Sequence, residues 1–173
     1  MNKLFLIVLG GFSLLLMSCA QQPDTGAADV RWDRDTCERC RMVLSDRYFA
    51  AQIRFFPQGK RSRVIKFDDI GCAVIWLEDK QWKNDSKTEI WVADYESGDW
   101  LDARIASYVK RKTSPMEYAL GATKKTVENS LNYEQAKQHI FDIEERFNVH
   151  GQQLKLRLEQ QASKRQQSQK EKR

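Results

Sequence analysis

The order of hydrophobic patterns in the first half of the chain constrains its fold most strongly. Residues 47–56 are aromatic and β-rich. After a turn, the extended stretch 62–67 sets Val64 and Lys66 on one face against Arg63, Ile65 and Phe67 on the other, which predicts a β-hairpin. Asp68 can cap a helix over the following run, whose apolar residues recur at helical spacing: Ile70, Ala73, Val74 and Leu77. Residues 89–95 then read as a strand, so these patterns predict a ββαβ unit.

The second half repeats this order in a weaker form. Residues 106–111 and 119–125 are strand candidates, separated by a break at a Ser-Pro-Met sequence. Residues 133–147 predict an amphipathic helix that Asn132 can cap, with one apolar face: Ala136, Ile140, Ile143 and Phe147. Residues 153–158 could form a final short strand or more helix. We therefore predict an α+β fold of two small ββαβ units in tandem.

The N-terminus has the features of an export signal. An apolar run over residues 4–17 follows Lys3 and is short for a transmembrane helix. It ends in Leu-Met-Ser before Cys19, a pattern that resembles the lipobox at which bacterial lipoproteins are cleaved and lipidated. An ordinary secretory signal is the alternative. Because Ala20 stands where aspartate usually marks inner-membrane retention, we expect a lipid anchor in the outer membrane, on its periplasmic face, with the inner membrane as the alternative.

These features divide the chain into five parts. We expect a lipoprotein signal peptide in residues 1–18, a lipidated tether in 19–30, the first ββαβ unit in 31–96 and the second in 97–160, followed by a basic, disordered tail in 161–173.

The charge distribution gives no sign of a nucleic-acid partner. The segment from residue 155 to the end holds seven Lys or Arg and two acidic residues, which accounts for the whole net charge of +5. The folded part is therefore close to neutral, and nucleic-acid binding would require a basic patch there.

The sulfur-containing residues are the strongest functional signal. If Cys19 carries lipid, three thiols remain, Cys37 and Cys40 in a C-x-x-C motif and Cys72 in the first predicted helix. An odd number of thiols in an oxidising compartment needs an explanation, and a bound metal is one. Met42 and Met116 lie at breaks in the hydrophobic pattern, and thiolates together with thioethers favour Cu(I).

Other interpretations of the same residues are open. The two histidines, His139 and His150, lack the spacing of a zinc module. The C-x-x-C pair could be a thiol–disulfide redox centre or a small structural disulfide. Cys72 fits a buried, inert thiol better than a ligand, and the methionines could fill the core.

The order of these motifs resembles the NosL family of lipoproteins that accompany nitrous oxide reductase. The resemblance rests on the lipobox cysteine, CERCRM, FDDIGCAVIWLE, VADYESGDWLDARIASYV and SPM, and runs from Cys19 to about Ala122. It implies a periplasm-facing Cu(I) protein that delivers copper to nitrous oxide reductase. It also implies a fold of two ββαβ units, similar to the metal-handling part of an organomercurial lyase.

The resemblance also implies candidate ligands. The family's C-x-x-C-G-M motif falls on Cys37, Cys40 and Met42, and its S/T-P-M motif ends at Met116; we expect Cys40 and Met116 to be the leading ligands. Two glycines of the family pattern are replaced here, by Arg41 and Glu117. We expect a copper chaperone, not an enzyme, with a membrane-tethered thiol–disulfide oxidoreductase as the alternative.

Overall fold

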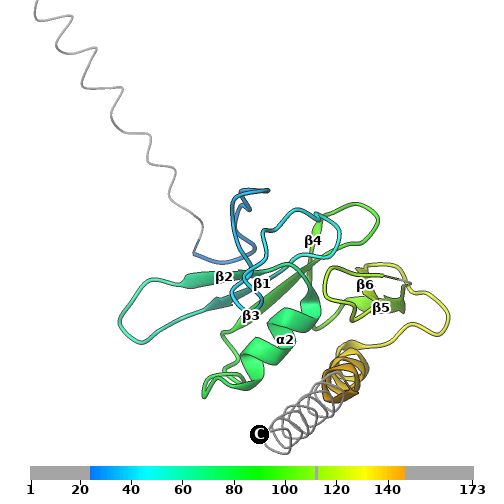
Figure 1. Ribbon diagram of the computed structural model, residues 1–173. Helices are drawn as coiled ribbons and strands as arrows, with labels where there is room; N and C mark the ends of the chain where they lie inside the picture. The colour runs from blue at the N-terminus through cyan, green and yellow to red at the C-terminus, as the bar shows by residue number, and fades with distance from the viewer. Residues whose placement is uncertain (1–23, 112, 147–173) are drawn as a thin grey trace, which may run out of the picture.

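The computed structural model describes residues 24–111 and 113–146 (Figure 1). The predicted signal peptide, the predicted lipidation site at Cys19, the segment 153–158 and the basic tail lie outside the described residues.

The first sheet has four antiparallel strands in the order β2-β1-β3-β4. Its strands are β1 (Ala51–Phe55), β2 (Arg63–Phe67), β3 (Glu89–Ala93) and β4 (Trp100–Asp102). In the centre, Ile53 of β1 is opposite Ile65 on one side and Ile90 on the other. The predicted hairpin and third strand are therefore confirmed. β4 follows residue 96, yet it pairs with β3 and extends the first sheet.

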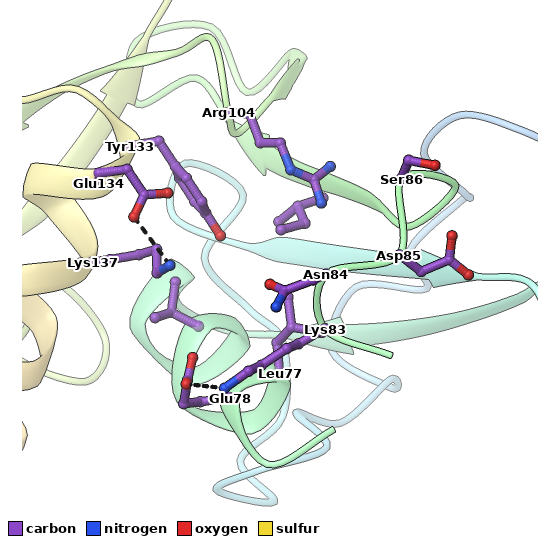
Figure 2. A pocket seen from close by; sticks show the side chains of 12 residues that line it. Leu77, Glu78, Lys83, Asn84, Asp85, Ser86, Arg104, Tyr133, Glu134 and Lys137 are labelled. Atoms are coloured by element: carbon purple, nitrogen blue, oxygen red, sulfur yellow. Dashed lines mark hydrogen bonds and ion pairs between the residues drawn. The ribbon is translucent and has the colours of Figure 1, made fainter. Parts of the chain in front are cut away.

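Helix α2 (Ile70–Glu78) lies against this sheet (Figure 1) and has an almost entirely apolar sequence. Its N-cap is Asp69, whose extended backbone lets Oδ1 accept the Gly71 N–H at 2.9 Å. The prediction that Asp68 caps the helix is wrong by one residue, and this frees the Asp68 carboxylate for other contacts. A cleft borders the C-terminal end of α2 (Figure 2).

The second sheet consists of β5 (Ser107–Lys110) and β6 (Leu120–Thr123), which pair antiparallel. Both lie within the predicted strand segments. A parallel bridge between Asp94 and Ala122 joins it to the end of the first sheet. A helix follows over residues 133–146, here called the C-terminal helix. Asn132 caps it, because Oδ1 accepts the Gln135 N–H at 2.9 Å. The α+β class is confirmed, and the described part of the second unit has the order ββα.

Part of the predicted tether packs along β1. Gln52 exchanges two hydrogen bonds with the backbone of Ala28, at 2.9 and 2.8 Å, and Arg54 Nε donates to the Gly26 carbonyl at 2.8 Å. Gln52 and Arg54 are buried, and buried polar groups need partners. The ordered structure therefore begins before residue 31.

The two units share one hydrophobic core. It combines residues from the first sheet, α2, the second sheet and the C-terminal helix, among them Phe67, Leu77, Tyr108, Leu120 and Ile140. Among the described helices, none combines the length and apolarity that crossing a bilayer requires.

Candidate metal centre

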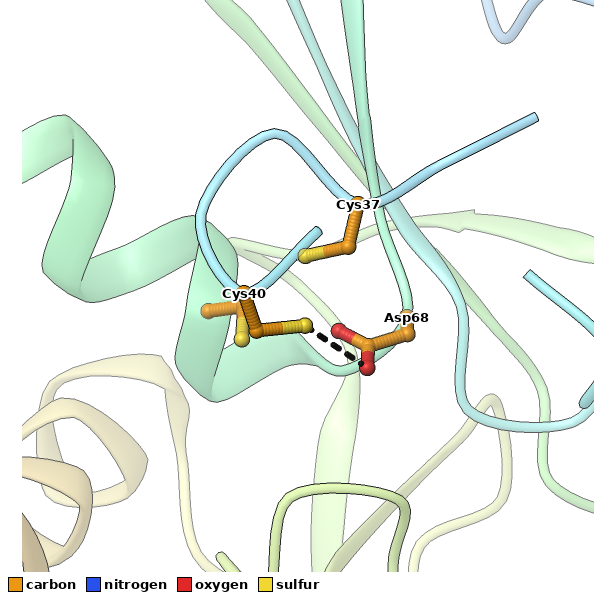
Figure 3. Close-up of side chains that lie close together, drawn as sticks. Cys37, Cys40 and Asp68 are labelled. Atoms are coloured by element: carbon orange, nitrogen blue, oxygen red, sulfur yellow. Dashed lines mark hydrogen bonds between the residues drawn. The ribbon is translucent and has the colours of Figure 1, made fainter. Parts of the chain in front are cut away.

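Three cysteines and one aspartate converge at the N-terminal end of α2. Single donor atoms of Cys37, Cys40, Asp68 and Cys72 all lie within 4.8 Å of one another (Figure 3). Cys37 and Cys40 come from the C-x-x-C loop, Asp68 follows β2, and Cys72 lies in the first turn of α2. We call these four residues the thiol cluster.

Backbone hydrogen bonds hold the C-x-x-C loop in place. The Cys37 N–H donates to the Met42 carbonyl at 2.8 Å, and the Arg41 N–H donates to the Cys37 carbonyl at 3.0 Å. The Glu38 N–H donates to the carbonyl of Lys66 in β2, also at 3.0 Å. This last bond fixes the loop beside the end of β2, where the chain continues into Asp68.

The three thiols differ in acidity. The Cys72 thiol hydrogen-bonds to Cys37 and lowers the pKa of Cys37 to about 6, although Cys37 is fully buried. The same hydrogen bond, followed by burial, raises the pKa of Cys72 well above its usual range. Burial raises the pKa of Cys40 to about 12. Cys37 is therefore the thiol that ionises most readily, and Cys40 and Cys72 resist ionisation.

Asp68 contributes an oxygen that has no partner. Cys40 Sγ donates to Asp68 Oδ2 at 3.2 Å, while Oδ1 is buried and makes no hydrogen bond within the described chain. A buried, unsatisfied acceptor is costly unless a ligand satisfies it. Three sulfurs and one carboxylate oxygen of Asp68 form a donor set that fits a thiophilic metal ion.

The sequence model of the NosL family matches residues 31–155. The chain belongs to the NosL family. A search among curated proteins finds no significant match. Membership of the NosL family indicates a copper-binding accessory protein, and the thiol cluster is a site that could hold a metal in this member.

Sequence reasoning identified only half of this cluster. It named Cys37 and Cys40, but treated Cys72 as a buried, inert thiol and Asp68 as a helix cap. A signal was present in the spacing, because Asp68 and Cys72 are four residues apart across a helix start. His139 is not part of the cluster; its Nε2 lies 3.0 Å from the Tyr118 carbonyl oxygen. His150 lies outside the described residues.

The Ser-Pro-Met turn is tied to the residue beside Asp68. Asp69 Oδ2 accepts the Ser114 hydroxyl at 2.6 Å and the Met116 N–H at 3.3 Å. Asp69 is fully buried, and burial raises its pKa to about 6. The Met116 side chain is half-buried and packs against the hydrophobic core. The cap of α2 thus anchors both the helix and the second NosL motif.

The two departures from the NosL glycine pattern keep a glycine-like backbone. Arg41 has φ of 66° and Glu117 has φ of 61°, both in the left-handed region that glycine favours. Each loop therefore holds a non-glycine residue in a glycine-like conformation, at the cost of local strain. On the first loop, Met42 is 50% exposed, so its thioether is open to solvent.

A polar network joins the C-x-x-C loop to the second unit. Arg39 Nη1 donates to the Tyr118 hydroxyl at 3.0 Å, and this hydroxyl donates to Glu144 Oε2 at 2.8 Å. Arg39 also forms an ion pair with Glu144 of the C-terminal helix. The Tyr118 ring lies directly against the backbone of Gly71, where a Cβ atom would be 2.1 Å from a ring carbon. Both units therefore help to position the thiol cluster.

Proposed function

We propose that this NosL protein binds Cu(I) through the thiol cluster and delivers copper to nitrous oxide reductase. The observation that carries the proposal is the meeting of three thiol sulfurs and the Asp68 carboxylate, one of whose oxygens is buried without a partner in the described chain. The lowered pKa of Cys37 favours the thiolate that a soft metal binds. Thiolates are soft ligands and select Cu(I) over hard cations. Cys37 would bind first, because its thiolate needs no deprotonation at neutral pH.

The raised pKa values of the other two thiols suit a site that must release its copper ion to another protein. Cys40 and Cys72 have raised pKa values, so each must release its proton to solvent before it binds the metal, which weakens binding. Copper held by such ligands is easier for a competing ligand to remove, because each released sulfur regains its proton. The exposed thioether of Met42 and the Met116 turn beside Asp69 would assist this exchange as weaker, neutral ligands.

The N-terminal pattern supports a proposal for the location. We propose a lipid anchor on Cys19 in the outer membrane, with the folded part on the periplasmic side; inner-membrane anchoring is the alternative. Metabolic labelling with a radioactive fatty acid tests the anchor, since Cys19→Ser should abolish incorporation. Membrane fractionation then distinguishes the two membranes.

The low pKa of Cys37 also favours a second function, thiol–disulfide exchange with Cys40. Such an enzyme would cycle between a reduced pair and a disulfide and would turn over a disulfide substrate. Thiol titration of protein purified without reductant separates the two functions. Thiols that copper protects support the chaperone, whereas turnover of a disulfide substrate without copper supports the oxidoreductase.

Anaerobic titration with Cu(I) against a coloured chelator tests the proposal directly. The full, reduced chain in detergent should remove one equivalent of copper from a tight chelator. Cys40→Ser should weaken binding severely because it removes an anionic ligand, and Met116→Leu should weaken it less. A second step offers the loaded protein to copper-free nitrous oxide reductase. Failure to take copper from the chelator, or to activate the reductase, contradicts the corresponding half of the proposal.

A further inference from the structure

A second concave site lies at the opposite end of α2 from the thiol cluster (Figure 2). The cleft has a volume of about 400 Å³ and is bordered by the end of α2, residues 83–86, Arg104 and the start of the C-terminal helix. Its α2 residues Leu77 and Glu78 follow Cys72 by more than one helical turn. None of the thiol-cluster residues lines it.

The floor of the cleft is apolar. Val74 and Leu77 of α2 and Ile90 of β3 line it, and all three are buried. A small aliphatic or aromatic group placed over them would gain hydrophobic contact without disturbing the core.

The charges on the rim are largely neutralised within the protein. Glu78 is paired with Lys83, and Glu134 is paired with Lys137 at 3.2 Å. Asp85 also borders the cleft, but Figure 2 shows its carboxylate directed away from the other side chains. These acidic groups therefore contribute little uncompensated negative charge to the interior of the cleft.

Arg104 supplies the uncompensated charge. Its Nη1 donates to the Thr88 carbonyl at 2.7 Å, which orients the guanidinium, and it makes no ion pair with any described residue. The Tyr133 hydroxyl and the Asn84 amide make no hydrogen bond to other described residues. Figure 2 shows the Arg104 guanidinium, the Tyr133 hydroxyl and the Asn84 amide facing the same space. The cleft thus presents hydrogen-bond donors above an apolar floor, together with the Arg104 cation, which pairs with no carboxylate in the described part of the chain.

We infer that this cleft binds a carboxylate that carries a small apolar side chain. The carboxylate pairs with the free edge of the Arg104 guanidinium and accepts from Tyr133, while the side chain covers Val74, Leu77 and Ile90. Such a group occurs in a free small acid and at the C-terminal residue of a protein chain. This binding is separate from copper binding.

N-acetyl-leucine is a suitable probe, and its neutral amide is the matched control. Ligand-observed NMR with the full chain in detergent should show N-acetyl-leucine binding with a Kd of about 1 mM, as expected for a ligand of this size. N-acetyl-leucinamide and the Arg104→Gln variant should each bind at least about tenfold more weakly. Lys87→Gln makes the same charge change outside the cleft and should leave the affinity unchanged. Detergent is kept at one concentration throughout.

A third probe distinguishes the two sources of the carboxylate. Acetyl-Gly-Gly-Leu should bind more tightly than N-acetyl-leucine if the natural ligand is a chain terminus, and no more tightly if it is a free acid. Equal binding of the acid and the amide, or undiminished binding to Arg104→Gln, would overturn the inference. Copper binding by Arg104→Gln should match that of the unaltered chain, so this test and that of the proposed function can fail separately.

Discussion

The slope of copper affinity against pH reports how many protonated thiols become metal ligands. Cys37 has a pKa of about 6, whereas the pKa values of Cys40 and Cys72 are raised above the usual value for a thiol. Between pH 7 and 9, binding by all three sulfurs must therefore release about two protons per Cu(I). Affinity should rise with pH by about a hundredfold per unit, or about 2.7 kcal/mol.

The perturbation that tests this count is Cys72→Ser. A serine hydroxyl can still donate a hydrogen bond to the Cys37 thiolate, so the pKa of Cys37 should stay low, but the third sulfur is lost. The variant should release about one proton per Cu(I) over the same range. Its affinity should then rise by about tenfold per pH unit, or about 1.4 kcal/mol.

The assay is competition with a Cu(I) chelator at several pH values, after the chelator's own pH dependence has been measured. Met116→Leu serves as a control, because a thioether carries no proton and the slope should not change. If the unaltered chain shows a tenfold rise per pH unit that Cys72→Ser leaves unchanged, Cys72 is not a ligand. That result would refute the three-thiolate site.

Three further predictions concern stability. Arg41→Gly should stabilise the fold by about 0.5–1 kcal/mol in chemical denaturation, because it relieves the strain of a positive φ. Glu38→Gly removes the same exposed ion pair without that relief, so it should not stabilise the fold. Burial opposes ionisation of Asp35, but its partners Lys66 and Arg31 lower its pKa from 3.8 to about 2. The ionised carboxylate therefore contributes about 2 kcal/mol to the free energy of unfolding above pH 4, and this contribution is lost as pH falls toward 2. Asp35→Asn should flatten that part of the curve of stability against pH. Gly71→Ala should destabilise by about 1–3 kcal/mol, since the new methyl group meets the Tyr118 ring, and Tyr118→Ala should remove most of this effect in the double variant.

Local patterns were sufficient to predict most elements of the fold. The two-faced pattern of residues 62–67, the helical spacing after Asp69 and the apolar run at residues 89–95 correspond to β2, α2 and β3. These signals are strong because each element buries one face or stripe, which imposes its own period on the sequence. Strand β4 and its pairing with the first sheet were missed, because β4 has three residues and strand partners depend on contacts that no local pattern encodes.

The choice between two adjacent aspartates shows the same limit at the site. Asp68 and Asp69 are chemically identical, and either can cap a helix. The backbone decides between them: Asp69 has the extended conformation of an N-cap, so Asp68 turns toward the cysteines. A one-residue difference in the start of α2 thus converts a predicted cap into a candidate metal ligand.

The sequence by itself determined which chemistry is available. It specified soft sulfurs in a C-x-x-C motif, two isolated methionines, an α+β order of elements and membership of the NosL family. Only the tertiary structure decided which groups meet. The bond from Glu38 to the end of β2 brings the C-x-x-C loop to Asp68 and Cys72, which follow it by some thirty positions in the chain. Such contacts depend on strand pairing and on the register of the helix start, and a linear pattern contains neither.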